Sequence, residues 1–316
     1  MQKILITFLF FHTFVFAKTI YPVATLQASG LVADMVVDAG VLYVATDAGV
    51  VDVIDLRTQR KVSQIAFEPM VTARGLVVPR RVHSVDRYKG KTLLVTSSIS
   101  MYREVWIDDG RHLKKIIDAS QHLMPKDAYF CATGKVVLGS FGSDITLYET
   151  QEGYKRYERH ISESTMGGMT LSHDKTQMIV ADESGIAQRI EIATAKVLEQ
   201  FQGEHVDNIY SVAYANHTLL TAGQDRRVGV YLANRSYHLK SDFLVYCVGI
   251  SPSGKLGVYS SGTQNHLQLF NTQEGKKTHT LVGHQSSPNR IFFVSEKTLI
   301  STGDEYSIYF WVLPSP

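Results

Sequence analysis

The stretch VVDVIDLRTQRK at residues 50–61 returns in related form three more times along the chain. The later copies are ITLYETQEGY (145–154), RIEIATAKVL (189–198) and LQLFNTQEGK (267–276). Each copy consists of alternating apolar residues, a polar turn that contains Thr, and the start of a second run. Such alternation around a short polar turn is typical of two antiparallel strands joined as a hairpin.

These hairpins belong to a longer repeat. A second hairpin, with small residues and a turn of Gly, Asp or Ser, overlaps or precedes each copy, as in LYVATDAGVV at 42–51. The same kind of hairpin occurs again near the end of the chain, as LISTGDEYSIYF at 299–310. The last large residues of the third strands are spaced 39–53 residues apart. These anchors are Ile54, Ile107, Tyr148, Ile192, Tyr231, Phe270 and Trp311. The spacing predicts seven units of about four strands each.

The repeat length decides the fold class. A four-stranded unit cannot bury both of its faces alone, so neighbouring units must stack. Radial stacking also leaves only short, protected strand edges. A β-helix has much shorter repeats, and a β-sandwich would not repeat one hairpin seven times. The sequence therefore predicts an all-β, seven-bladed β-propeller.

The two ends of the chain predict how the ring closes. The seventh unit stops at its third strand, SIYFWVL at 307–313, and only Pro-Ser-Pro follows. Residues 19–26 (TIYPVATL) form an extra strand-like segment before the first unit. We therefore expect the N-terminal strand to serve as the outer strand of the last blade.

The first 17 residues have the pattern of a secretory signal. Lys3 provides the positive start, residues 4–16 are almost wholly apolar, and Ala17 offers a small residue for cleavage. The apolar run is too short for a membrane span, which needs about 20 residues. The alternatives are a buried helix or an uncleaved anchor. We expect residues 1–17 to be removed and residues 18–316 to form one propeller domain in the periplasm.

Composition narrows the range of partners. The chain has 32 Lys and Arg residues against 30 Asp and Glu residues, whereas nucleic-acid-binding domains usually carry a concentrated basic face. No second apolar stretch is long enough to cross a bilayer. We therefore expect a monomer that binds neither nucleic acid nor membranes.

The chain contains two cysteines, Cys131 and Cys247. No CxxC or CxxCH pattern indicates redox chemistry, a metal site or covalent haem. Both lie in strand-like apolar runs, in blades that are not neighbours on the repeat assignment. We expect two buried free thiols, with a disulfide as the alternative.

The seventh unit resembles a WD40 repeat. It has Gly283-His284, then Ser301 and Glu305 around the turn STGDE, then Trp311. In that family a His, a Ser or Thr, an Asp and the Trp form a hydrogen-bonded tetrad, so the resemblance implies a tetrad here with Glu305 in place of Asp. The fifth unit is similar, and its members would be His205, Thr221, Asp225 and Tyr231 in place of Trp. WD40 propellers mostly present surfaces to partners.

A catalytic interpretation of the same residues is weaker. A Ser-His pair begins many acyl-transfer sites, but His284 and Ser301 lack a recognisable third acid, an exposed elbow and an oxyanion hole. No two histidines have metal-ligand spacing, and no Gly-rich phosphate loop occurs. We expect no enzyme activity, no catalytic or metal site and no cofactor. The alternative is a propeller enzyme of the lactonase or quinoprotein-dehydrogenase type with its site at the central channel.

A narrower resemblance concerns the whole chain. The export signal and the opening ASGLVADMVVDAGVLYVATDAGVVDVIDL at 28–56 are similar to the periplasmic propellers that accompany the periplasmic nitrate reductase of epsilon-class proteobacteria. This resemblance implies a protein partner, namely a component of a molybdenum-containing nitrate reductase. It also implies a role in the maturation or activity of that enzyme.

One segment interrupts the even spacing. Between the first two units lies FEPMVTARGLVVPRRVHSVDR at 67–87, with Arg74, Arg80, Arg81 and Arg87 among apolar residues. Long loops on a regular scaffold often carry function, and Arg is enriched at interface hot spots. We expect a partner-binding loop, with a plain solvated loop as the alternative.

Overall fold

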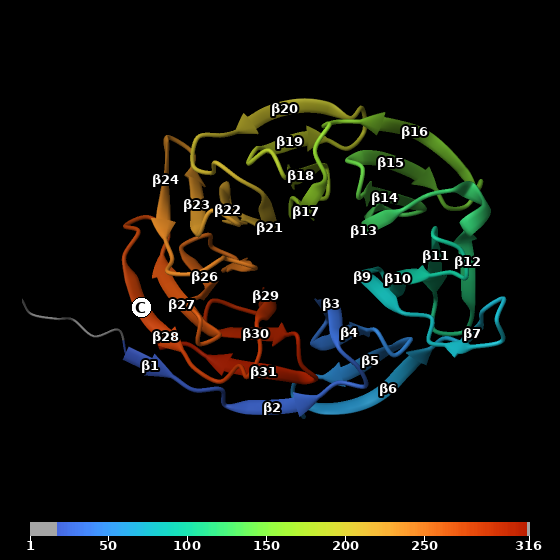
Figure 1. Cartoon of the computed structure of the whole chain (residues 1–316), viewed down its shortest axis with the longest axis horizontal. Helices are drawn as coiled ribbons and strands as arrows, with labels where there is room; N and C mark the ends of the chain where they lie inside the picture. Colours follow the sequence, from blue (N-terminus) through green and yellow to red (C-terminus); the bar gives the residue numbers. More distant parts are fainter. Residues whose placement is uncertain (1–17, 315–316) are drawn as a thin grey trace, which may run out of the picture.

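The computed structural model describes residues 18–314 and forms a seven-bladed β-propeller, as the repeat predicted (Figure 1). The predicted signal sequence, residues 1–17, lies outside the described residues. In each blade the strands that follow one another along the chain pair antiparallel, and the first of them lies nearest the axis (Figure 1). In the part of the chain that is described, no helix has the length and apolar character needed to cross a membrane.

The blades follow the chain in order. Blade 1 contains β3 (Val32–Asp38), β4 (Val41–Thr46), β5 (Val50–Asp55) and β6 (Arg60–Ala66), and blade 2 contains β9 (Val82–Tyr88), β10 (Lys91–Ser97), β11 (Arg103–Asp108) and β12 (Leu113–Ile117). Blade 3 contains β13 (Pro125–Ala132), β14 (Lys135–Ser140), β15 (Asp144–Glu149) and β16 (Tyr154–His160), and blade 4 contains β17 (Met166–Leu171), β18 (Gln177–Asp182), β19 (Ala187–Glu191) and β20 (Lys196–Phe201). Blade 5 contains β21 (Ile209–Ala215), β22 (Thr218–Gly223), β23 (Arg227–Leu232) and β24 (Arg235–Lys240). Blade 6 contains β25 (Val248–Ile250), β26 (Leu256–Ser261), β27 (His266–Asn271) and β28 (Lys277–Leu281), and blade 7 contains β29 (Pro288–Phe293), β30 (Thr298–Gly303) and β31 (Ser307–Val312). A single 3₁₀ turn, η1 (Ala119–Gln121), precedes blade 3 among the described residues.

The N-terminal segment closes the ring, as predicted, but it is divided between two blades. Strand β2 (Ala24–Gln27) pairs antiparallel with β31 and completes blade 7. Strand β1 (Lys18–Ile20) instead pairs parallel with β28, which gives blade 6 a fifth strand. The segment therefore holds two neighbouring blades together.

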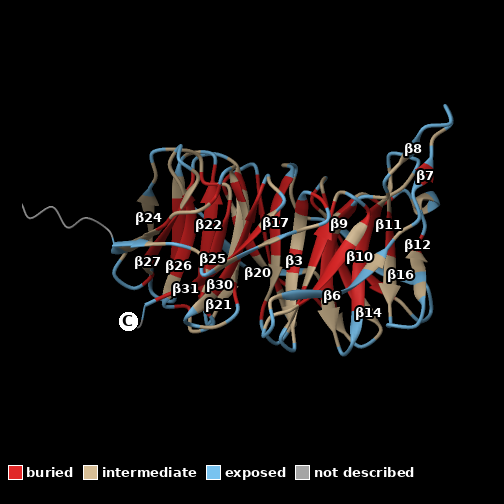
Figure 2. Cartoon of the chain, turned by 90° about the horizontal axis from the view of Figure 1, so that it is seen from below, coloured by how far each residue is buried: buried red, intermediate tan, exposed pale blue. Residues whose placement is uncertain are grey.

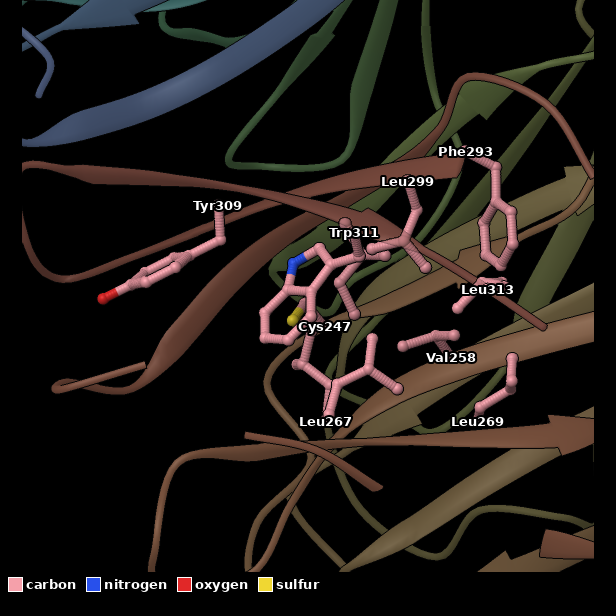
Figure 3. Packing of buried hydrophobic residues seen from close by; sticks show 11 residues of the cluster. Cys247, Val258, Leu267, Leu269, Phe293, Leu299, Tyr309, Trp311 and Leu313 are labelled. Atoms are coloured by element: carbon pink, nitrogen blue, oxygen red, sulfur yellow. The ribbon is translucent and has the colours of Figure 1, made fainter. Parts of the chain in front are cut away.

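The core consists of apolar layers between the blades, because each sheet turns one face to either neighbour. Figure 2 shows the buried residues concentrated in the strands of the ring, whereas the connecting loops are mostly exposed. Between blades 6 and 7 the indole of Trp311 lies beside Cys247 and Leu267 (Figure 3). Trp311 is 1% exposed, which makes it one of the largest fully buried side chains.

Both cysteines are free, as expected, but only Cys247 is buried, and Cys131 is partly exposed. Burial raises the pKa of the Cys247 thiol to about 12 and that of Cys131 to about 11. A thiol with a raised pKa holds little thiolate near neutral pH and is therefore a poor nucleophile.

The N-terminal segment 18–27, which we call the clasp, generates a stability prediction. Deleting residues 18–27 from protein that lacks residues 1–17 should lower the melting temperature by roughly 10 °C or more. The deletion removes the β2–β31 ladder and exposes the edge of blade 7, and a loss of about 1 kcal/mol shifts the midpoint of such a chain by roughly 2–4 °C. Deleting residues 18–20 alone removes only β1 and should cost less. Equal melting temperatures for all three proteins, measured by circular dichroism, would exclude the clasp.

Candidate functional site

The structure brings His284, Ser301, Glu305 and Trp311 into one hydrogen-bonded chain. His284 Nδ1 lies 3.0 Å from Glu305 Oε1, and His284 Nε2 lies 2.7 Å from Ser301 Oγ. The Trp311 indole N–H donates to the same Ser301 oxygen over 2.8 Å. Because a carboxylate can only accept, Nδ1 carries the proton and Nε2 accepts from the Ser301 hydroxyl. This chain ties the loop before β29 to strands β30 and β31.

Glu305 also fixes the loop itself. Its Oε1 accepts from the backbone N–H of Gln285 (3.2 Å), and its Oε2 accepts from the Tyr309 hydroxyl (2.9 Å). In blade 5, Asp225 accepts from the equivalent backbone N–H, that of Val206, over 2.9 Å. The longer Glu side chain thus makes the same loop contact as Asp.

Blade 5 reproduces only part of this arrangement. His205 lies 3.0 Å from Asp225 Oδ1 and 2.7 Å from Thr221 Oγ1. The Tyr231 ring occupies the place of the indole, but its buried hydroxyl finds no hydrogen-bond partner among the described residues. A phenol places its polar atom at the far end of the ring, whereas an indole N–H lies on its flank. His205, Thr221 and Asp225 therefore form a triad from which Tyr231 is left out.

Burial argues against nucleophilic chemistry at these groups. Glu305 does supply the third acid that is not recognisable in the sequence, since it contacts His284 Nδ1. Ser301, however, is 0% exposed, so no substrate can reach its hydroxyl. Burial lowers the pKa of His284 although Glu305 opposes the shift, and it lowers the pKa of His205 in the same way. Both imidazoles are therefore neutral near neutral pH, which suits a fixed hydrogen-bond chain.

The four arginines of the 67–87 segment separate into different environments. Residues 67–81 connect β6 to β9, and they contain a hairpin of β7 (Met70–Val71) and β8 (Val77–Val78). Arg74 and Arg81 are exposed. Arg87 lies beyond the connection, because the innermost strand of blade 2, β9, already begins at Val82.

Arg87 and Arg80 make contacts within the ring. Arg87 pairs with Asp38 of blade 1 (Nε–Oδ2 3.3 Å), and its guanidinium lies 4.4 Å from the centre of the Tyr43 ring. Arg80 forms an ion pair with Glu104 and lies 5.7 Å from the centre of the Trp106 ring. The side chain of Arg80 is only 19% exposed. These two residues are therefore structural, and the expectation of a partner-contact role applies only to Arg74 and Arg81.

The hairpin projects from one end of the ring, above blade 2 (Figure 2). The loop 98–102 lies at its base, since Ser97 N donates to Arg81 O over 2.9 Å. Five apolar side chains of the hairpin and this loop are more than half exposed, and we call them the hairpin surface. They are Val71, Leu76, Val77, Ile99 and Met101. This surface combines exposed apolar area with the exposed arginines.

The innermost strands carry a second set of functional candidates. Six of them show a shift in register near their start, so that one residue bulges out of the ladder at the same end of the channel. The bulged residues are Ala33, His83, Lys126, Gly167, Tyr210 and Asn289. Bulges re-aim side chains and are frequent next to functional sites. At Gly167 a Cβ would lie 1.6 Å from Ile209 O, so only Gly allows blades 4 and 5 to approach this closely.

Charged side chains follow these bulges along the innermost strands. Arg290 Nε donates to Asp34 Oδ1 over 3.3 Å, and Asp34 also accepts from the backbone N–H of Val85. Asp127 is buried, and burial raises its pKa although Arg290 opposes the shift. Toward the other end of the strands, Lys175 lies 3.5 Å from Asp86. Within residues 18–314, no group of three His, Cys, Asp or Glu residues has the geometry of a metal site.

The tetrad of blade 7 can be tested by mutation. His284→Ala should lower the free energy of unfolding by about 1–3 kcal/mol, because the buried Ser301 hydroxyl loses its acceptor and Glu305 loses one of its donors. The matched control is His266→Ala, on a partly exposed position of β27. Urea denaturation measures both variants. A His284→Ala variant as stable as the control would refute the structural role.

The lowered histidine pKa values predict how stability depends on pH. Unfolded His205 and His284 titrate near 6.5, but burial lowers both pKa values in the folded protein. Below about pH 6.5 the unfolded state therefore binds more protons, and the free energy of unfolding should fall as the pH decreases. His83 adds to this effect down to about pH 4, whereas exposed His160, with a raised pKa, opposes it.

The measurement compares urea denaturation at about pH 7 and about pH 5. The double variant His205→Gln/His284→Gln keeps neutral hydrogen-bonding side chains and should lose less stability between the two conditions. Identical pH profiles for the variant and the parent protein would contradict this assignment.

Comparison with known proteins leaves the family of this chain open. No family profile matches the sequence, and no curated protein matches it either.

Proposed function

We propose that the protein is an exported, periplasmic accessory protein that binds other proteins, and that it acts without enzyme activity or a cofactor of its own. The observation that carries this proposal is the hairpin surface. Exposed apolar side chains that gather in one region of a surface often mark a site of protein interaction, and Val71, Leu76 and Val77 belong to one short hairpin. Here the patch stands above a rigid, regularly packed ring, where loops are well placed to contact a partner.

The narrower proposal concerns the partner. The similarity of residues 28–56 to propellers that accompany periplasmic nitrate reductase supports a component of that enzyme as the partner, with this protein in the role of the accessory protein NapL. On this proposal the propeller assists maturation or activity of the reductase. The tetrad in blade 7 supports the further resemblance to WD40 propellers, which act mainly by binding.

A second candidate function is a propeller enzyme with its site in the central channel. The observation that favours it is Asp127, a buried carboxyl group with a raised pKa beside Arg290 and Asp34. Functional acids often have such perturbed pKa values, although structural ion-pair networks perturb them as well. Metal analysis and activity screening of the purified protein separate this candidate from the first.

The hairpin surface provides the test of the leading proposal. The triple variant Leu76→Ser/Val77→Ser/Met101→Ser should lose its protein partner in affinity purification from a periplasmic extract, because the apolar contact area is removed. The matched control is Val62→Ser/Val197→Ser/Leu198→Ser, which changes exposed apolar residues on the outer strands β6 and β20. Mass spectrometry of the recovered proteins, including nitrate reductase subunits, is the measurement. Equal recovery by both variants, with unchanged melting temperatures, would move the interface elsewhere.

A further inference from the structure

We propose that the channel mouth between blades 2 and 3 is an anion-binding site, formed by Arg81, His83, Arg103 and Lys126, that takes a carboxylate or a phosphate-like group. This proposal rests on the contacts and charges of these four residues and does not depend on the accessory function. The ligand is recognised by its negatively charged oxygens. They can belong to a free anion or to an acidic side chain of a protein.

Short contacts hold three of these groups next to one another. His83 is the bulged residue of β9, and its Nε2 lies 2.8 Å from Ser97 Oγ. Ser97 is paired with Arg103 on the neighbouring strand β11. Its backbone N–H donates to Arg81 O over 2.9 Å. The His83 imidazole and the backbones of Arg81 and Arg103 therefore meet at one serine at the end of blade 2, and the charges of both arginines act on His83.

Lys126 extends the cluster to blade 3. It is the bulged residue of β13, which lies beside β9 at the axis (Figure 1). Phe141 links it to blade 2, because the Arg103 guanidinium lies 4.9 Å and the Lys126 ammonium 5.8 Å from the centre of the Phe141 ring. Two cations from different blades thus share one aromatic ring.

These cations lack carboxylate partners. Among the described residues, Arg81, Arg103 and Lys126 have no Asp or Glu oxygen within 4.0 Å. Arg103 donates instead to Pro125 O over 2.9 Å, and Lys126 to Met166 O over 3.1 Å. A protein usually pairs cations that are partly removed from water. A cluster held without such a pair is suited to an external anion.

The lowered pKa values of the cluster also favour the binding of an anion. Burial lowers the pKa of Arg103 and that of Lys126. Burial also lowers the pKa of His83 to about 4, and the charges of Arg103 and Arg81 add to the shift. A bound anion would offset the repulsion among these groups. It would therefore raise the pKa of His83.

Carboxylates near the mouth leave the cluster incompletely neutralised. Asp34 is engaged by Arg290. Asp127 interacts with Arg290, Lys126 and Arg103, but it forms no ion pair within 4.0 Å among residues 18–314. Glu183, on an exposed loop of blade 4, also acts on Lys126. In the described part of the chain, none of these acids forms an ion pair with the cluster, whose exposed member is Arg81, whereas His83, Arg103 and Lys126 are partly buried.

The test is a titration of the purified protein followed by NMR. The probes are acetate, inorganic phosphate and the tripeptide acetyl-Gly-Glu-Gly-amide, at constant ionic strength. We expect saturable shifts of the His83 imidazole and of the Arg103 Nε–H signal, and a rise in the His83 pKa from about 4 toward 6.5. Saturation by acetate or phosphate assigns the site to free anions, whereas saturation by the tripeptide alone assigns it to acidic side chains.

Two matched variants make the test specific. Arg81→Gln removes an exposed cation of the site, should leave the fold intact, and should weaken binding about tenfold, as expected for one lost charge-assisted hydrogen bond. Arg74→Gln removes an equally exposed charge from the nearby hairpin and should leave the affinity unchanged. The absence of saturable shifts with all three probes, or an equal effect of both variants, would overturn the proposal.

Discussion

The pairing of β2 with β31 is the constraint on which the rest of the molecule depends. These strands come from opposite ends of the chain, so the last blade cannot be completed until both ends are present. The register places Ala24 opposite Phe310 and Leu26 opposite Ile308. An open ring would expose one face of blade 1 and one of blade 7, where Ile300, Ile308 and Phe310 now pack against Met35 and Val44. Local hairpin geometry alone therefore cannot stabilise this fold, because its apolar layers exist only in the closed ring.

Within the closed ring, the blades use different chemistry to attach the loops that lead into them. Blade 7 uses a neutral histidine between Glu305 and Ser301, and blade 5 uses a shorter triad. Blade 2 uses an arginine, since Arg80 binds Glu104 and covers Trp106, whose indole N–H donates to Thr96 over 3.0 Å. In each case a polar side chain before the first strand reaches across to the inner part of the sheet. Blade 2 therefore attaches its loop through an arginine rather than through the histidine of the WD40-like set.

The sequence predicted the features that depend on local patterns. Alternation and repeat spacing gave seven blades, and the residue types at His284, Ser301 and Trp311 gave the tetrad. The errors have physical causes. Tyr231 was placed in a tetrad by its position, but the reach of a phenol differs from that of an indole. Arg87 was assigned to a loop because spacing does not show where an inner strand begins. Ile192 was taken as a strand residue, yet β19 ends at Glu191.

The channel mouth was missed for a different reason. Its residues come from separate blades, and no short spacing connects them. A signal was nevertheless present, because charged residues such as Lys126, Asp127 and Arg290 interrupt first strands that are otherwise apolar. A charge in an innermost strand must face the axis or a neighbouring blade, since the rest of the strand is packed. Searching the first strand of each repeat for such residues would have identified the mouth before the structure did.

The hairpin surface and the cationic mouth are mechanically linked through blade 2. Residues 79–83 run from β8 into β9, so the partly buried Arg80 lies directly between the exposed hairpin and the pair Arg81 and His83. Its ion pair with Glu104 fixes the backbone on both sides, and Lys115 adds a second contact to the same carboxylate at 2.7 Å. A group that binds at the mouth and a protein that contacts the hairpin therefore meet one rigid unit. Arg80 and Arg81 are adjacent in the chain, so the ion pair that fixes the end of the hairpin also fixes the backbone from which Arg81 and His83 project.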